Sequence, residues 1–125
     1  MRISTGTDII EIERVKKSIE ETEGKFCERV YTEKEIEYCE SKKNVKYQHY
    51  AGRFAAKEAI FKAVSDFLDD KFEISWKDAE VLNDKNGKPK IIFKSKKIQE
   101  KIESIDISIS HCKEYAVANV AIICK

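Results

Sequence analysis

Two acidic side chains and a lysine have the types and the spacing to bind a phosphate through a metal ion. Glu58 and Lys62 lie one helical turn apart, and Asp8 lies near the start of the chain. Mg²⁺ typically takes one or two protein carboxylates and completes its shell with waters and substrate phosphates. Asp8 and Glu58 would suffice as its protein ligands, and the Lys62 ammonium would meet a phosphate.

Each of these residues also has an ordinary structural interpretation. A strand aspartate such as Asp8 often accepts hydrogen bonds from backbone N–H groups. Glu58 and Lys62 have the i,i+4 spacing of a common surface ion pair, which adds little to the stability of a helix. The residues alone therefore leave both interpretations open.

The run Ile107–His111 suggests a different chemistry, because Ser110 and His111 could form the serine–histidine pair of a hydrolase. Adjacent residues of a strand point to opposite faces, so these two side chains cannot easily bond each other. A histidine that caps the turn after the strand is the structural alternative. We therefore do not expect a hydrolase dyad.

A strand and a helix are expected to carry the first of these residues. Residues 3–12 are rich in Ile and Thr and partly alternate, which predicts a strand. Its alternation places Ser4, Gly6 and Asp8 on one face, with open space beside the carboxylate. Residues 13–23 follow as a short charged helix that ends near a glycine.

Two further helices are expected before the middle of the chain. Thr32 and Glu35 form a capping-box signature, which predicts a helix over residues 33–41. The longest helix is predicted over residues 46–69 from apolar residues at 3.6-residue spacing. Its core face carries Ala56, Ile60, Ala63, Val64 and Phe67. Its opposite side carries Phe54, Glu58, Lys62 and Ser65.

The second half of the chain is expected to be mainly β. Strands are predicted over residues 72–76, 79–83, 90–93, 105–110 and 115–124, the last of them buried on both faces. Asn86-Gly87 supplies the positive-φ position of a turn between the strands over 79–83 and 90–93, and Pro89 limits the pairing of these two strands. A lysine-rich helix is predicted over residues 95–104. These elements predict an α+β fold with helices packed on an antiparallel β-sheet.

Four motifs occur together and in order along the chain. They are Gly6-Thr7-Asp8-Ile9-Ile10-Glu11-Ile12, Arg53-Phe54-Ala55-Ala56-Lys57-Glu58-Ala59 with Lys62, Asn83-Asp84 with Gly87-Lys88-Pro89, and Ser108-Ile109-Ser110-His111. This set resembles the holo-[acyl-carrier-protein] synthase family, the small 4′-phosphopantetheinyl transferases of bacterial fatty-acid synthesis. The resemblance covers nearly the whole chain, so it implies that residues 1–125 form one domain with the fold of that family.

The resemblance implies an activity and its partners. The family transfers the phosphopantetheine arm of coenzyme A to a serine of apo acyl carrier protein, and it releases adenosine 3′,5′-bisphosphate. It requires Mg²⁺ and is typically a homotrimer with active sites between subunits. The neighbouring subunit then contributes the turn at Gly87–Pro89 and the strand end at His111.

The resemblance also assigns roles to residues. The catalytic residues are expected to be Asp8, Glu58 and Lys62, of which Asp8 and Glu58 hold Mg²⁺. The residues expected to bind coenzyme A are Arg53, Lys62, Ser65, Gly87, Lys88, Pro89 and His111. The residues expected to meet the acidic carrier protein are Arg14, Lys16 and Lys17.

Composition excludes some classes of protein. The chain has 24 Lys and Arg and 23 Asp and Glu, a formal net charge of +1, so it is not a globally basic nucleic-acid binder. Its apolar stretches are too short to span a bilayer and no secretory signal opens the chain. Four cysteines without metal-binding spacing indicate a reduced, cytoplasmic protein with free thiols.

Two rival functions remain at this point. A non-catalytic binding module of the same fold would recognise an acidic protein or RNA through the lysine-rich residues 85–101. A small metal-dependent phosphohydrolase would release phosphopantetheine from coenzyme A without any acceptor. We expect neither a nucleic-acid partner nor a membrane partner.

Overall fold

The computed structural model describes residues 2–68 and 74–125. Its order of elements is β1 (Arg2–Glu11), α1 (Ile12–Glu21), α2 (Lys25–Val30), α3 (Glu33–Glu40), η1 (Lys43–Val45), α4 (Lys46–Val64), η2 (Ser65–Phe67), η4 (Trp76–Asp78), β2 (Ala79–Asn83), β3 (Pro89–Phe93), α5 (Lys96–Lys101), β4 (Ile102–His111) and β5 (Tyr115–Cys124). This is the α+β fold that the sequence predicts.

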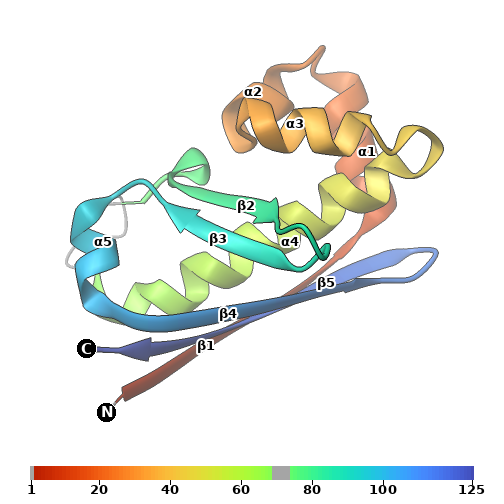
Figure 1. The fold of residues 1–125 in the computed structure, drawn as a ribbon. Coiled ribbons are helices and arrows are strands. Elements are labelled where there is room, and N and C mark those ends of the chain that lie inside the picture. The colour runs from red at the N-terminus through yellow and green to blue at the C-terminus, as the bar shows by residue number, and fades with distance from the viewer. Residues whose placement is uncertain (1, 69–73) are drawn as a thin grey trace.

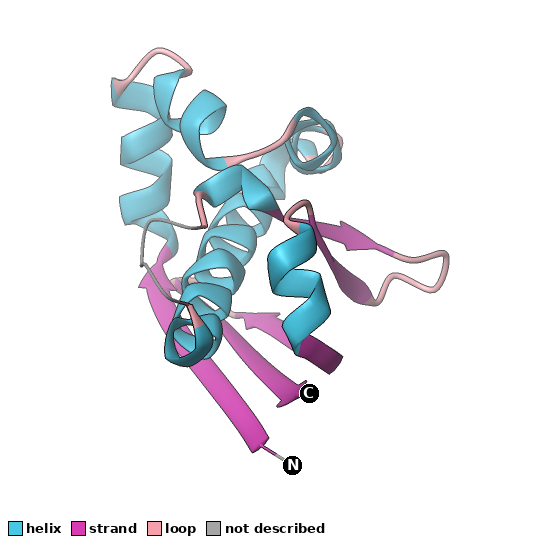
Figure 2. Ribbon diagram, turned by 90° about the vertical axis from the view of Figure 1, so that its left-hand side faces the viewer, coloured by secondary structure: helices cyan, strands magenta, loops and turns pink. Residues whose placement is uncertain are grey.

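The strands form two antiparallel sheets. The larger sheet has the order β1-β5-β4, and the smaller is the β2–β3 hairpin. In the larger sheet Asp8 pairs with Ala118, which in turn pairs with Ile109 of β4. The long helix α4 lies against this sheet, α1, α2 and α3 gather at one end of α4, and the hairpin lies beside it (Figure 1). The end-on view shows helices over one face of the larger sheet only (Figure 2).

One face of β1 lies directly against the backbone of α4. Ser4 and Gly6 are buried, and the Ser4 hydroxyl donates a hydrogen bond to the carbonyl of Ala63. A Cβ atom added to Gly6 would lie 1.9 Å from the carbonyl oxygen of Ala59. Only a residue without a side chain permits this approach. The shared face of Ser4, Gly6 and Asp8 is therefore confirmed, but the open space expected along it is filled at Ser4 and Gly6 by the backbone of α4.

Two hydrophobic clusters lie on either side of α4. The first cluster joins the sheet and hairpin to the second half of α4, and its fully buried members include Ala59, Ile60, Ala63, Val81, Val120 and Ile122. The second lies beneath α1, α2 and α3, and its members include Val15, Val30, Tyr31, Cys39 and Tyr50. Because α4 contributes to both clusters, it is the central element of the molecule.

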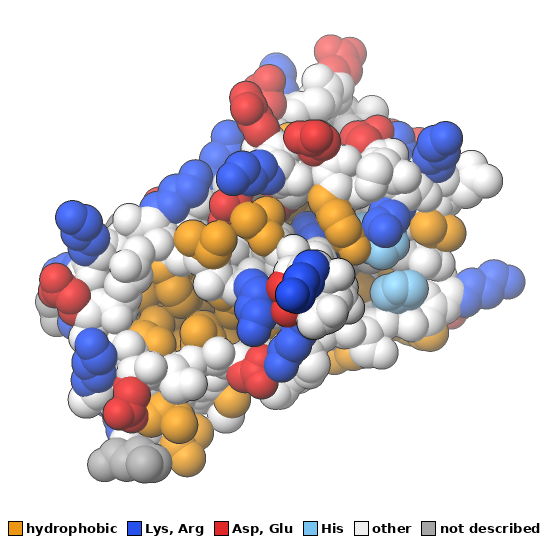
Figure 3. Space-filling view, viewed as in Figure 1, with side chains coloured by type: hydrophobic (Ala, Val, Ile, Leu, Met, Phe, Trp, Pro, Cys, Tyr) orange, Lys and Arg blue, Asp and Glu red, His pale blue; other side chains and the backbone are white. Residues whose placement is uncertain are grey.

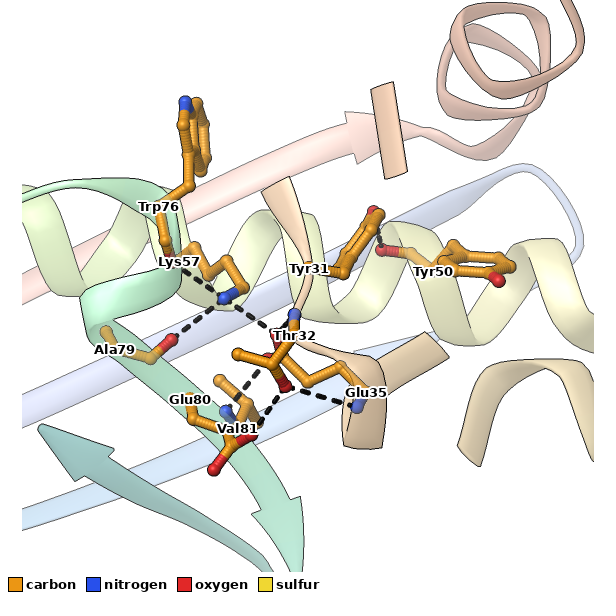
Figure 4. A network of polar contacts seen from close by, with 9 residues as sticks. All are labelled: Tyr31, Thr32, Glu35, Tyr50, Lys57, Trp76, Ala79, Glu80 and Val81. Carbon is orange, nitrogen blue, oxygen red and sulfur yellow. Dashed lines mark hydrogen bonds and ion pairs between the residues drawn. The ribbon is translucent and has the colours of Figure 1, made fainter. Parts of the chain in front are cut away.

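A buried ion pair connects α3 with α4. The Lys57 ammonium lies 2.9 Å from a carboxylate oxygen of Glu35, and both side chains are fully buried. The ammonium also donates to the carbonyls of Trp76 and Ala79 (Figure 4). A buried charge needs such partners, since the loss of hydration is otherwise uncompensated. Burial lowers the pKa of Lys57, and the charge of Glu35 opposes that change.

Glu35 also completes the capping box that the sequence predicts. Its carboxylate accepts a hydrogen bond from the Thr32 backbone N–H at 2.8 Å, and the Thr32 hydroxyl accepts one from the Glu35 N–H. The second Glu35 oxygen accepts a hydrogen bond from the Val81 N–H at 2.9 Å. One carboxylate thus fixes the start of α3, the first residues of the hairpin and Lys57 (Figure 4).

The long helix is shorter than predicted. α4 ends at Val64 and the chain continues as the 3-10 turn η2, whereas the expectation was a helix to residue 69, which lies outside the described residues. The Ser65 hydroxyl donates to the Lys62 carbonyl at 2.8 Å. Serine side chains that bond nearby carbonyls compete with the helix, which accounts for the earlier end.

The predicted strand over residues 72–76 lies partly outside the described residues. Residues 74 and 75 are not in a strand, and Trp76 begins the 3-10 turn η4, so this part of the prediction is wrong. The Asp78 carboxylate accepts hydrogen bonds from the Ser75 N–H and hydroxyl. This cap holds a turn where the β-branched and aromatic residues suggested a strand.

Three other features also differ from the predictions. α5 ends at Lys101 instead of residue 104, because Ile102 begins β4. α2 was not predicted, since six residues are too few for a periodic signal. β5 alternates between buried and partly exposed residues and is not buried on both faces, because helices cover only one face of the larger sheet (Figure 2).

The contact at Gly6 yields a stability prediction. We expect Gly6→Ala to lower the free energy of unfolding by about 3 kcal/mol, the upper end of the usual cost of overpacking, because Cβ would meet helix backbone. Gly52→Ala is the matched control. Its Cβ would lie 3.0 Å from the movable Ile109 side chain, and alanine favours a helix, so we expect a change below about 1 kcal/mol. Urea unfolding measures the free energy of unfolding of both variants. Equal losses of stability in the two variants would contradict the prediction.

Candidate functional site

The structure brings Asp8 of β1 together with Lys62 of α4. The Lys62 ammonium lies 3.2 Å from an Asp8 carboxylate oxygen and donates to the carbonyl of Thr7 at 2.9 Å. The Asp8 side chain is 18% exposed and the Lys62 side chain is 54% exposed. The pair therefore lies at the surface, where a ligand can reach it, and its position follows from the close approach of β1 to α4.

Glu58 lies one turn before Lys62 on α4 and is half-buried. Burial raises the pKa of the Glu58 carboxyl, the negative charge of Asp8 raises it further, and the positive charge of Lys62 opposes both effects. The two carboxylates thus repel each other. A positive ion between them would remove this repulsion, so the arrangement favours cation binding.

The donor set suits a hard cation with few protein ligands. Within residues 2–68 and 74–125, no group of three or more His, Cys, Asp or Glu side chains could enclose a metal ion. Asp8 and Glu58 offer two carboxylates at the surface, and the remaining ligands would have to come from water or a substrate. Mg²⁺ is commonly bound in this way, so these residues fit the expected ion.

A second group of predicted residues gathers around Arg53. Arg53 is only 4% exposed, and its Nη2 donates a hydrogen bond to the Asn83 side-chain carbonyl. The Asn83 amide donates to the Gly87 carbonyl at 2.8 Å. Arg53 is therefore tied to the β2–β3 turn. Its Nε atom is buried and has no hydrogen-bond partner.

The β2–β3 turn has the conformation that the sequence predicts. Gly87 has a φ of 83°, and an Asp84 carboxylate oxygen accepts hydrogen bonds from the backbone N–H groups of Asn86 and Lys88. The exposed Lys88 ammonium lies 3.3 Å from Asp106 of β4. Pro89, expected just before the strand over residues 90–93, is instead the first residue of β3.

His111 lies at the end of β4 and contacts α4. Its ring centroid is 5.8 Å from that of His49, and the two histidines appear side by side in the space-filling view (Figure 3). A cavity of about 590 Å³ lies nearby, between α3 and the β2–β3 turn, and Tyr38, Arg53 and Gly87 are among its lining residues. This volume is typical of small-molecule sites.

The predicted residues therefore form two groups. Asp8, Glu58 and Lys62 make the carboxylate–lysine group, and Ser65 follows it one turn later with its hydroxyl bonded to the Lys62 carbonyl. The arginine–histidine group contains Arg53, Asn83, Gly87 and His111, and the His49 ring contacts this group at His111. No hydrogen bond or ion pair joins the two groups in the described part of the chain. Arg53 and Glu58 are five residues apart, so they point about 140° apart around the helix.

Three members of the site region were missed as site residues. Asn83 directly precedes the predicted turn, so its position was a usable signal. Tyr38 and His49 belong to different helices, and their contact, with ring centroids 5.6 Å apart, depends on how α3 crosses α4. Nothing in the spacing of these two residues predicts that contact.

The predicted docking residues lie on α1, directly after β1. Arg14 and Lys17 are exposed, and Lys16 is half-buried with its ammonium 5.7 Å from the centre of the Tyr47 ring. The last turn of α1 has no basic residue. The positive charge of α1 is thus confined to the end nearer Asp8.

Two other features of the described residues concern their helices and their cysteines. No helix among them is both long enough and apolar enough to cross a membrane. Cys27, Cys39, Cys112 and Cys124 are all free, as predicted, and only Cys112 is exposed.

Comparisons with known proteins agree with the resemblance. The model of the 4′-phosphopantetheinyl transferase superfamily matches residues 4–120. A holo-[acyl-carrier-protein] synthase of Ruminiclostridium cellulolyticum is 45% identical over 98% of this chain and 92% of its own. The Bacillus anthracis synthase, in complex with coenzyme A (3′,5′-ADP), superposes with a TM-score of 0.78 at 39% identity, covering 95% of this chain and 94% of that one. The Helicobacter pylori synthase, in complex with coenzyme A, gives 0.82 at 32%, with coverage of 95% and 99%.

Proposed function

This chain belongs to the holo-[acyl-carrier-protein] synthase family of the 4′-phosphopantetheinyl transferase superfamily, and we propose that Asp8, Glu58 and Lys62 are its catalytic residues. The function of the chain is to transfer 4′-phosphopantetheine from coenzyme A to apo acyl carrier protein. The observation that supports the assignment of residues is the carboxylate–lysine group, in which β1 and α4 place two repelling carboxylates and one ammonium at the surface.

In the proposed reaction, a serine oxygen of the carrier protein forms a bond to the phosphorus of the phosphopantetheine group. The bond from that phosphorus to adenosine 3′,5′-bisphosphate breaks, and the bisphosphate leaves. Glu58 accepts the serine proton, directly or through a bound water. The Lys62 ammonium leaves its ion pair with Asp8 and binds the pyrophosphate instead. There it neutralises the negative charge that grows on the leaving group.

Asp8 and Glu58 would hold Mg²⁺ in this proposal. The ion would supply charge neutralisation for the pyrophosphate and would polarise the phosphorus that is attacked. Asp8 is carried by β1 and Glu58 by α4, close to where Gly6 brings these two elements together. The backbone geometry of β1 and α4 therefore positions both carboxylates before any ligand binds.

The arginine–histidine group is proposed to bind the adenosine bisphosphate part of coenzyme A. Arg53, Lys88 and His111 supply positive or hydrogen-bonding groups, and the backbone at Gly87 and Pro89 lines the turn. Ser65 would contact the phosphates from the end of α4. Since this group lies apart from the carboxylate–lysine group in one chain, we propose that each site combines the two groups from neighbouring subunits.

The first prediction of this proposal concerns the catalytic residues. We expect wild-type protein with coenzyme A and Mg²⁺ to add one phosphopantetheine group to an apo carrier protein, and Asp8→Asn or Glu58→Gln to slow this transfer at least about 100-fold. The cause is loss of charge at the cation site. Asp66→Asn is the matched control, because Asp66 is an exposed acid that pairs with Arg2.

Intact-mass spectrometry of the carrier protein measures the transfer, and circular dichroism checks that each variant is folded. Full activity in the folded Asp8→Asn variant would contradict the metal assignment. Release of phosphopantetheine without an acceptor would indicate a phosphohydrolase. Binding of an acidic protein or RNA without any transfer would indicate a non-catalytic module.

The second prediction concerns a homotrimer. The face of the larger sheet that lacks helices exposes apolar side chains, with Ile3 65%, Ile9 64% and Tyr115 43% exposed (Figure 2). A second and third copy of the chain would cover this face. We expect sedimentation equilibrium to give the mass of a trimer, and Ile9→Glu to dissociate it. Ile92→Glu, at a position that is 47% exposed on β3, should leave the trimer intact. A wild-type monomer would contradict the proposal.

The third prediction concerns the carrier protein, which is acidic in this proposal. We expect the double change Arg14→Glu and Lys17→Glu to raise the KM for the carrier protein about tenfold, while the KM for coenzyme A stays nearly constant. The double change Lys94→Glu and Lys96→Glu alters the net charge equally at exposed positions near α5, away from α1 (Figure 1). Equal effects of the two pairs on transfer kinetics would argue against docking on α1.

The cytoplasm is the proposed location. Four free cysteines persist most readily in a reducing compartment. Coenzyme A and the carrier protein would meet the enzyme there.

A further inference from the structure

Two aromatic side chains connect members of the arginine–histidine group that are far apart in the sequence. Tyr38 of α3 contacts Arg53, and His49 of α4 contacts both Tyr38 and His111. The four side chains form a continuous row from the β2–β3 turn to the end of β4. We name this row the aromatic bridge.

Tyr38 holds the guanidinium of Arg53 from one side. The guanidinium carbon lies 4.0 Å from the centre of the Tyr38 ring, a close cation–π contact. Asn83 accepts a hydrogen bond from the same guanidinium. Arg53 is nearly buried, so the ring and the amide together fix the plane of its charged group beside the cavity.

His49 connects Tyr38 with His111 through ring contacts. Its centroid lies 5.6 Å from that of Tyr38 and 5.8 Å from that of His111, and both contacts are edge-to-face. Burial lowers the pKa of His49 to about 4, and the nearby positive charges of Lys42, Arg53 and His111 lower it further. His49 is therefore neutral near pH 7 and supports His111 as an aromatic ring and not as a charge.

The cavity beside the bridge is suited to an anion. Lys34, Lys42, Arg53 and Lys85 line it, against Glu37 and Asp84. The Asp84 carboxylate already accepts two backbone hydrogen bonds within the turn. The positive side chains therefore outnumber the free acids. Lys42 also lies 4.8 Å from the centre of the Tyr38 ring, on the same bridge.

We propose that Tyr38 and His49 are positioning residues that fix Arg53 and His111 in the orientation in which these two bind the phosphorylated ribose of coenzyme A. The proposal rests on the proposed function, because it assigns Arg53 and His111 to coenzyme A. Neither Tyr38 nor His49 needs to touch the ligand. Each restricts the motion of a long or exposed side chain before binding, which lowers the entropy that binding must remove.

The test compares removal of each ring with its conservative replacement. We expect Tyr38→Ala and His49→Ala to weaken the binding of adenosine 3′,5′-bisphosphate roughly threefold to thirtyfold, the range of cation–π and ring contacts converted to affinity. Tyr38→Phe and His49→Phe keep a neutral ring and should restore binding to within about twofold. In transfer assays, the alanine variants should raise the KM for coenzyme A much more than they lower kcat.

Tyr47→Ala is the matched control. Tyr47 is another half-buried aromatic residue of α4, and its ring contacts Tyr50 and not the bridge. Isothermal titration calorimetry measures the affinities, and thermal unfolding reports the fold of each variant. We expect Tyr47→Ala to bind the bisphosphate as the wild type does.

The outcomes separate this inference from the function on which it rests. Failure of the wild type to bind adenosine 3′,5′-bisphosphate or coenzyme A would overturn the assignment of Arg53 and His111. Wild-type binding that is unchanged in both alanine variants would overturn the role of the aromatic bridge alone. Equal loss in the alanine and phenylalanine variants would also overturn it, because the ring would then not be the feature that matters.

Discussion

The place of the carboxylate–lysine group depends on how closely β1 approaches α4, and that approach depends on Gly6. The added Cβ would lie 1.9 Å from the Ala59 carbonyl oxygen, so any side chain would push the strand away from the helix. Asp8 is two residues further along the same face, and Lys62 is one turn beyond Ala59. A shift of β1 would therefore lengthen the 3.2 Å contact between these two charges and open the site that they form with Glu58.

α4 carries parts of both groups, but it presents them in different directions. Glu58 and Lys62 face β1 at one end of the helix, while Arg53 and His49 face α3, the hairpin turn and β4 at the other. A single helix thus sets the distance between the proposed cation site and the proposed anion site without bringing them together. This separation is consistent with a substrate that is long, carries several phosphates and is bound between copies of the chain.

Much of the fold and part of the site could be predicted from local patterns. The alternation of Ser4, Gly6 and Asp8 and the i,i+4 spacing of Glu58 and Lys62 each specify a face, and the structure places those faces together. The end of α4 could not be predicted from apolar periodicity, because the apolar pattern continues to Phe67 while the backbone tightens into the 3-10 turn η2 after Val64. The neighbours of Arg53 depend on how α3 crosses α4, and no local pattern encodes such a crossing.

The Glu35 carboxylate has a further consequence for how the molecule opens. It accepts hydrogen bonds from the cap of α3 and from β2 and pairs with Lys57 of α4, and both charged side chains are fully buried. If α3 alone detached, Lys57 would remain as a buried charge without its counter-ion, which is costly. α3, the hairpin and the middle of α4 should therefore open together as one cooperative unit, and their slowest amide hydrogens, including that of Val81, should exchange at a common rate.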